Sequence, residues 1–172
     1  QGMLPPTDQD PVPSTLDWDL WIGPSPMRPF KAEWPEDHYS LRQIKARGGK
    51  SGLRAVYHPW NFRGWWDFGT GALGDMGCHH LNTPYRALKL THPTSVSASA
   101  SMVYEDTAPL ASIVTYDFPE REDMPAVRIV WYDGGLKPCY PRQLEGRPLP
   151  NEGTMYVGDE GVMLGSAIFP AA

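Results

Sequence analysis

Apolar and polar residues recur at helical spacing between residues 72 and 90. The apolar positions fall on one face of such a helix and comprise Leu73, Met76, Leu81, Tyr85 and Leu88. The opposite face follows steps of four, three, four and three residues and carries Asp75, His79, Asn82, Arg86 and Lys89. The spacing predicts an amphipathic helix over 72–90. Pro84 lacks the N–H that would bond the carbonyl of His80, so we expect a kink near residues 80–83.

From residue 95 onward the period changes to two, which is typical of strands. Alternation predicts strands over 96–104, 111–118 and 126–133, and a hairpin over 153–165 that turns at Gly158 to Gly161. The serine face of the first strand is expected to meet either water or another subunit. One helix followed by consecutive strands predicts an α+β fold, with the helix packed on one face of an open antiparallel sheet.

Residues 1–70 show neither period and hold six of the seven tryptophans. Such a Trp- and Pro-rich segment is ordered only if its indoles are buried, so we expect a long loop region that wraps over a neighbouring surface. We assign it to the same domain as the helix and sheet of residues 71–172. Basic residues around Gly48 and Gly49 are expected to form a solvated short helix and loop: Arg42, Lys45, Arg47, Lys50 and Arg54.

Composition narrows the classes of partner. The chain has 172 residues and a formal net charge of −5, which gives no reason to expect a nucleic acid or an anionic membrane as partner. No apolar run is long enough to span a bilayer. Two cysteines do not make a disulfide framework and leave the compartment undecided. Because the sequence starts inside a polar, Pro-rich run and stops without a polar tail, we expect an internal fragment or a processed piece of a longer protein.

Gly69-Thr70-Gly71-Ala72-Leu73-Gly74 spells G-x-G-x-x-G, the fingerprint of a dinucleotide-binding turn. That turn needs a buried strand before it and an acidic residue about twenty positions later. Here the preceding residues are aromatic and polar, and no carboxylate occurs between residues 90 and 98. We therefore expect no cofactor site in these residues. The glycines instead allow a tight turn into the helix, which places Asp75 in or near its first turn.

Asp75 and His79 lie one helical turn apart on the same face. A carboxylate four residues before an imidazole orients the ring or raises its pKa, which suits acid–base chemistry near neutral pH. The same spacing is also common in surface pairs, so the pattern alone leaves both interpretations open. A metal site is not expected, because Cys78 and His80 point away from this face. His80 is expected beside the apolar face as a half-buried, hydrogen-bonded residue.

Two segments carry a family resemblance, namely "LDWDLWIGPSP" (16–26) and "YHPWNFRGWWDFGTGALGDMGCHHLNTPYRALKL" (57–90). They resemble the C-terminal domain of the bacterial Gfo/Idh/MocA oxidoreductases, the glucose–fructose oxidoreductase and inositol dehydrogenase family. The resemblance implies that the chain lacks the N-terminal Rossmann domain, which binds NAD or NADP and would be its partner. It also implies a homo-oligomer formed through the sheet. Alone, the chain is expected to be inactive.

The family's helix motif, G-x-x-x-D-x-G-x-H-x-x-D, matches at Gly71, Asp75, Gly77 and His79. The resemblance implies that Asp75 and His79 are the catalytic pair, with His79 taking the proton from a sugar hydroxyl. The final Asp of the motif is Asn82 here, and the family's Glu-Lys-Pro motif has no counterpart. Residues 30–57 look like an insertion.

Residues before the glycine turn are expected to line a pocket for a carbohydrate or polyol: Asn61, Arg63, Trp66 and Asp67, together with Asn82. Trp65 and Trp66 also fit a purely structural role as core anchors. The sequence thus predicts the substrate-binding and catalytic domain of an NAD(P)-dependent oxidoreductase. An NAD-dependent glycosidase of the same family, a non-catalytic carbohydrate-binding or assembly module, and an unstable fragment remain alternatives.

Overall fold

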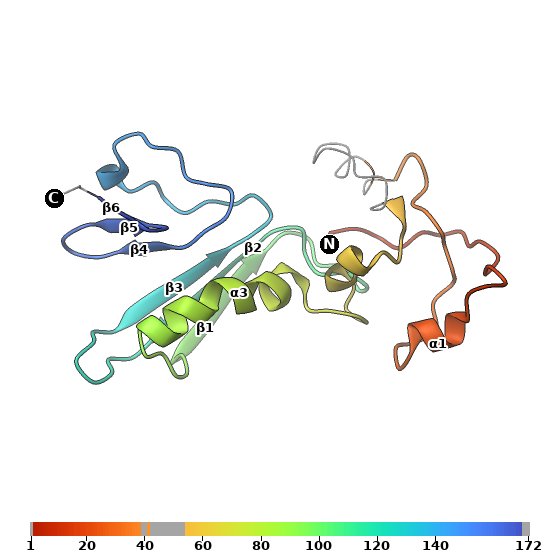
Figure 1. Ribbon diagram of the computed structural model, residues 1–172, viewed down its shortest axis with the longest axis horizontal. Helices are drawn as coiled ribbons and strands as arrows, with labels where there is room; N and C mark the ends of the chain where they lie inside the picture. Colours follow the sequence, from red (N-terminus) through yellow and green to blue (C-terminus); the bar gives the residue numbers. More distant parts are fainter. Residues whose placement is uncertain (1, 39–40, 42–53, 170–172) are drawn as a thin grey trace. The chain divides into compact units, whose positions relative to one another are not determined.

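The computed structural model describes residues 2–38, 41 and 54–169, and the contacts within it divide the chain into two compact units (Figure 1). The first unit comprises Gln1–Asp75 and Ala100–Leu110, and the second comprises Met76–Ser99 and Ala111–Ala172. Most of the basic cluster expected around Gly48 and Gly49 lies outside the described residues.

The first unit contains little regular structure. Helix α1 (Trp18–Ile22) is one short turn, and the Asp17 side chain caps it by accepting a 3.0 Å hydrogen bond from the Leu20 N–H. The 3₁₀ helix η2 (Pro59–Gly64) is the other element that positions the site. Apart from these short elements, residues 2–38 and 54–70 form turns, bends, isolated bridges and irregular loops.

Aromatic side chains hold this unit together. Its buried core consists of Trp34, Leu41, Val56 and Trp65, with Trp65 only 1% exposed. Around α1, Trp18 stacks on Trp21 with ring centroids 4.8 Å apart. The expectation that buried indoles order this segment is therefore confirmed for Trp18, Trp34 and Trp65.

Residues 100–110 complete the first unit by pairing with the end of η2 and the residues that follow it. The Ala108 N–H donates to the Gly64 carbonyl at 3.0 Å, and the Trp66 N–H donates to the Asp106 carbonyl at 3.0 Å. The backbone near residues 106–108 thus pairs within the first unit. Strand β1 (Ser95–Ala100) ends at Ala100, so the strand predicted over 96–104 is too long.

Arg28 joins three parts of this unit through ion pairs. Its guanidinium bonds to the Asp67 carboxylate and lies 2.8 Å from that of Asp106, and it covers the Trp65 ring at 5.0 Å from the centroid. Burial lowers the pKa of Arg28, but the hydrogen bonds to Asp67 and Asp106 outweigh burial, so the net pKa lies above its ordinary value. The loop region is thus fixed by charge as well as by packing.

Helix α3 (Gly71–Ala87) confirms the amphipathic helix predicted over 72–90 and continues through Pro84. It ends three residues before the predicted limit. Lys89 adopts a left-handed conformation with φ 48°, and the Leu90 N–H donates back to the Tyr85 carbonyl at 2.9 Å. This bond satisfies one of the last carbonyls of the helix and stops its continuation.

The second unit contains a sheet with strand order β1-β2-β3 (Figure 1). Strands β2 (Ser112–Phe118) and β3 (Val127–Tyr132) pair antiparallel, with Val114 opposite Trp131 and Phe118 opposite Val127. Both strands confirm their sequence predictions to within a residue at each end. All six residues of the edge strand β1 are exposed.

The C-terminal half of α3 packs on one face of this sheet. The Tyr85 ring meets Phe118 edge-on at 5.7 Å, and the half-buried His80 lies 6.2 Å from the Trp131 ring. The helix-on-sheet arrangement predicted from the sequence is therefore confirmed, as is the half-buried position of His80.

A second antiparallel sheet contains β4 (Met155–Val157), β5 (Val162–Leu164) and β6 (Ala167–Phe169). It confirms the hairpin, because the Gly158 N–H donates to the Gly161 carbonyl at 2.9 Å across the turn. The strands are divided between two three-stranded sheets, a division that the sequence analysis did not specify. Four prolines between β3 and β4 lack the N–H that would continue the first ladder. The α+β class itself holds.

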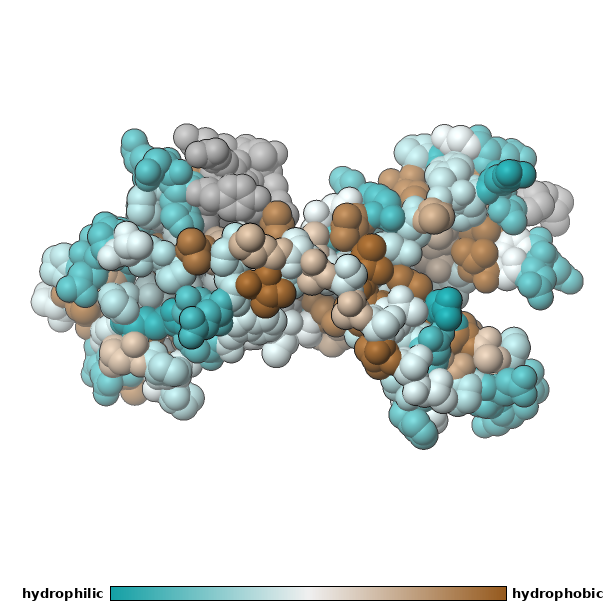
Figure 2. All heavy atoms as spheres, turned by 180° about the vertical axis from the view of Figure 1, so that it is seen from behind, coloured by the Kyte–Doolittle hydropathy of each residue, from teal (hydrophilic) through white to brown (hydrophobic). Residues whose placement is uncertain are grey.

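Figure 2 shows apolar residues scattered among larger polar areas of the surface. Large apolar side chains more than half exposed include Leu20, Met102 and Val103. Within the described ranges, no helix has the length and apolarity needed to cross a bilayer.

Candidate functional site: a cavity between η2 and the start of α3

The start of α3 is held against η2 by a very close backbone contact. A Cβ placed on Gly69 would lie 2.6 Å from the Cα of Arg63 and 3.1 Å from the carbonyl oxygen of Phe62. Gly71 opens the helix with φ 74°, a conformation that L side chains rarely adopt. The G-x-G-x-x-G glycines therefore serve a tight turn between a 3₁₀ helix and an α-helix.

Helix η2 sets the direction of two side chains. Its first turn is capped by His58, whose Nδ1 accepts a 3.1 Å hydrogen bond from the Trp60 N–H, and Pro59 follows with its φ already fixed. Residues three apart are eclipsed in a 3₁₀ helix, so Trp60 and Arg63 share one side. The Arg63 guanidinium accordingly lies 4.0 Å from the Trp60 ring centroid.

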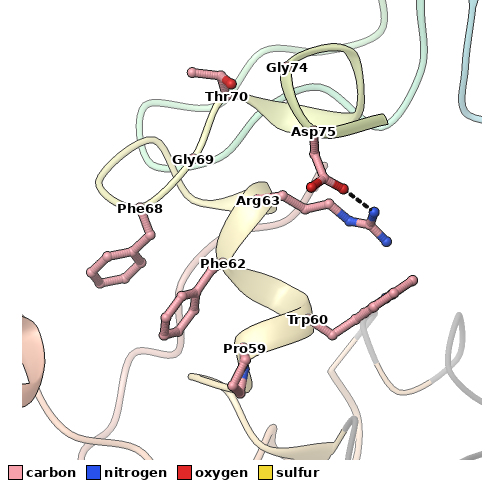
Figure 3. Close-up of a pocket in the computed structure, with 9 residues that line it drawn as sticks. All are labelled: Pro59, Trp60, Phe62, Arg63, Phe68, Gly69, Thr70, Gly74 and Asp75. Atoms are coloured by element: carbon pink, nitrogen blue, oxygen red, sulfur yellow. Dashed lines mark hydrogen bonds and ion pairs between the residues drawn. The ribbon is translucent and has the colours of Figure 1, made fainter. Parts of the chain in front are cut away.

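Arg63 also binds Asp75 across the gap between the two helices. Its Nη1 donates to Asp75 Oδ2 at 2.5 Å (Figure 3). The Arg63 side chain is 21% exposed and that of Asp75 is 42% exposed, so the pair faces a space that solvent reaches. Asp75 lies just beyond the first helical turn, which carries no acidic residue. The ion pair, together with its place on α3, fixes this carboxylate.

These residues border a cavity of about 360 Å³, and its described lining residues all belong to the first unit. Figure 3 shows that Arg63 and Asp75 face each other, whereas the rings of Phe62 and Phe68 point away from the ion pair. The lining thus combines aromatic surface with one pair of opposite charges and a hydroxyl. The described lining residues are Pro59, Trp60, Phe62, Arg63, Phe68, Gly69, Thr70, Gly74 and Asp75.

Of the residues expected at the site, Arg63 and Asp75 line this cavity, and the other three from the same segment bond elsewhere. Asn61 donates through Nδ2 to the Ala55 carbonyl at 2.9 Å. Trp66 donates through Nε1 to the Tyr104 carbonyl at 3.3 Å, and Asp67 pairs with Arg28. Each of these side chains holds a loop in the structure.

His79 and Asn82 lie farther along α3, and both are exposed. His79 follows Asp75 by four residues in the same helix, which agrees with the spacing expected from the sequence. They belong to the second unit, whereas Asp75 belongs to the first.

Sequence reasoning did not assign the other described lining residues to the site, among them Trp60, Phe62, Phe68 and Thr70. The spacing of Trp60 and Arg63 by three, directly after Pro59, was a usable signal, because it places an aromatic face beside a cation in a tight helix. Among the described residues, no group of three or more His, Cys, Asp or Glu side chains is arranged to hold a metal ion.

Comparison with known proteins finds one family model that matches a segment of the chain. Residues 53–123 match the model of the C-terminal alpha/beta domain of an oxidoreductase family, Gfo/Idh/MocA. The match covers η2, the whole of α3, the described lining of the cavity, and strands β1 and β2. A search of curated proteins finds no match to the chain. The segment 53–123 therefore belongs to the C-terminal α/β domain of the Gfo/Idh/MocA oxidoreductase family.

Proposed function

We propose that this chain supplies the substrate-binding and acid–base part of an NAD(P)-dependent oxidoreductase that acts on a sugar, polyol or glycoside. The observation that carries the proposal is the cavity beside Asp75, in which an aromatic side chain and an ion pair meet. An aromatic face for a sugar ring, with polar groups for its hydroxyls, is a typical way to bind carbohydrate. Trp60 is 56% exposed and supplies that face.

His79 is the proposed acid–base residue. The family motif places it four residues after Asp75, and its ring is exposed on α3. In the proposed oxidation, His79 takes the proton of a substrate hydroxyl while the carbon that bears the hydroxyl gives up its hydride and becomes a carbonyl. Asp75 holds the substrate or orients the imidazole. Asn82, one turn beyond on the same helix, is proposed to hydrogen-bond the substrate.

The glycine turn before α3 does not fit a nicotinamide cofactor. The residues that precede it form η2 and a turn, and Gly69 is already packed against the Arg63 backbone. The hydride acceptor is therefore proposed to be bound by an N-terminal domain, as the family resemblance implies. The same resemblance, together with strand β1, all of whose residues are exposed, supports a homo-oligomer formed through the sheet.

The test is turnover by the protein that joins this chain to its nucleotide-binding domain, with NAD and NADP and a panel of sugars and polyols. We expect His79→Ala to lose most activity while cofactor binding is retained, and His92→Ala, which changes another exposed histidine, to behave as wild type. Equal turnover by His79→Ala would contradict the acid–base role. Product analysis distinguishes net oxidation from glycoside cleavage without net redox change.

A further inference from the structure

Arg63 is held at both ends of its side chain. A Cβ on Gly69 would come within 2.6 Å of the Arg63 Cα, so the glycine turn packs directly against this backbone. At the other end, the guanidinium carbon lies 4.0 Å from the centroid of the Trp60 ring, on the side of η2 that the two residues share. The place of the guanidinium is therefore set by η2 and the turn that follows it.

This guanidinium donates from Nη1 to Asp75 Oδ2 at 2.5 Å, and Figure 3 shows the two side chains facing each other. The side chains are 21% and 42% exposed. The pair of Lys89 and Glu122 has the same distance between nitrogen and oxygen, but its side chains are 47% and 67% exposed. Solvent screens an exposed pair more strongly. The bond from Arg63 therefore restrains its carboxylate more than the bond from Lys89 does.

Asp75 depends on this donor more than Arg63 depends on Asp75. An aspartate side chain turns about two bonds, and Gly74, the preceding residue, has no side chain that could restrain it. The stacking of Arg63 on Trp60 does not involve Asp75. Loss of the arginine would thus remove one restraint on the direction of the carboxylate, whereas loss of the carboxylate would leave the guanidinium on its ring.

We infer that Arg63, braced by Trp60, is a positioning residue that directs the Asp75 carboxylate toward substrate in the cavity. This role rests on the function proposed above and adds to it a residue that acts through Asp75. Arg63 need not touch the substrate, and Asp75 need not be bound by Arg63 alone. What the role requires is a planar cationic donor at this place in the wall.

The first test is a double-mutant cycle in kcat/KM. It uses the protein that joins this chain to its nucleotide-binding domain, with the sugar or polyol of the panel above that it turns over fastest. We expect Arg63→Gln to lower kcat/KM at least about tenfold in the wild-type background and less than about threefold in the Asp75→Asn background. Equal factors in both backgrounds would overturn the positioning role and leave the proposed function standing. No turnover of any substrate by the wild type would overturn both.

Lys89→Gln is the matched control for this cycle. It removes a cation that is paired at the same distance just after α3, and Lys89 is not among the described lining residues of the cavity. We expect kcat/KM to stay at the wild-type value. A loss equal to that of Arg63→Gln would overturn the inference, because any ion pair near the helix would then have the same effect.

Chemical rescue separates positioning from structural support. Arg63→Ala removes the guanidinium beside a cavity that solvent reaches, so guanidinium chloride is expected to restore kcat/KM at least about threefold, and equal sodium chloride is not. Trp60→Leu in the same chain should weaken this restoration, because the added ion loses its ring. A folded Arg63→Ala variant that guanidinium does not restore would overturn the inference. Circular dichroism verifies folding, and if one arginine variant unfolds, the measurement on the other decides.

Discussion

The backbone of Gly69 lies against the backbone of Arg63 so closely that a Cβ on the glycine would come within 2.6 Å of the arginine Cα. This contact sets where α3 begins relative to η2, and hence where Asp75 meets Arg63. A backbone neighbour cannot rotate away as the end of a flexible side chain does.

Gly69→Ala is therefore expected to lower the free energy of unfolding by about 2 kcal/mol, the cost of overpacking a tight site. Chemical denaturation followed by tryptophan fluorescence measures this, because six of the seven tryptophans belong to the first unit. Gly158→Ala is the control, since its Cβ would meet nothing nearer than the Gly161 carbonyl oxygen at 3.8 Å. Equal effects of the two substitutions would refute this account of the glycine turn.

Arg28→Ala is expected to destabilise the first unit by about 3 kcal/mol, because it leaves the partly buried Asp67 and Asp106 carboxylates without a cation. The matched change is Arg128→Ala, which breaks a pair with Asp117 in which the arginine side chain is 66% exposed. That substitution should cost much less, because solvent screens an exposed ion pair. Urea denaturation of both variants tests the contrast, and a small loss for Arg28→Ala would show that the network adds little.

Trp60→Ala is expected to weaken sugar binding about tenfold, which corresponds to the loss of about 1.4 kcal/mol of contact with the ring. Trp66→Ala should leave the affinity near the wild-type value, because its indole bonds to the Tyr104 carbonyl and does not line the cavity. Calorimetric titration of both variants with the same neutral ligand distinguishes the two tryptophans. A larger loss in Trp66→Ala would restore the sequence-based assignment.

Acid is expected to destabilise the fold through Asp117 and Asp10. The hydrogen bond from Arg128, and then that from Ser95, lowers the pKa of Asp117 below its ordinary value of 3.8. The Ala32 N–H and then Lys31 lower the pKa of Asp10 in the same way. Because the unfolded chain takes up these protons first, the stability that they contribute is complete above pH 3.8 and is lost as the pH falls through the lowered pKa values.

Thermal melting across the acid range measures this loss, and Asp117→Asn should flatten part of it. A carboxyl titration by NMR gives the pKa of Asp117 directly. A value at or above 3.8 would exclude the proposed stabilisation by Arg128.

The elements with a strong local period were predictable from the sequence. Apolar side chains that recur about every 3.6 residues predicted helix α3. Apolar side chains that recur every two residues predicted strands β2 and β3 and the β4–β5 hairpin. The division into two sheets was not predictable in this way, because it depends on where a Pro-rich connection can pair. The end of β1 at Ala100 depends on pairing of residues 106–108 with 64–66, which no local pattern reveals.

In the candidate site, too, the local features were predictable and the long-range contacts were not. The four-residue spacing of Asp75 and His79 is a local property of one helix, and the structure preserves it. Asp75 pairs with Arg63, which lies twelve residues earlier, before a turn that shows no periodicity. The sequence analysis proposed Trp66 and missed Trp60. The Trp66 indole bonds to the Tyr104 carbonyl, 38 residues later, and no local pattern indicates that contact.

The chain passes between its two units more than once, and this limits where it can be truncated. The boundaries at 75/76, 99/100 and 110/111 mean that the polypeptide passes from one unit to the other three times. The first passage falls inside α3 and the second inside β1. A single truncation therefore cannot release either unit whole, and a cut after Asp75 would sever the helix on which both proposed catalytic residues lie.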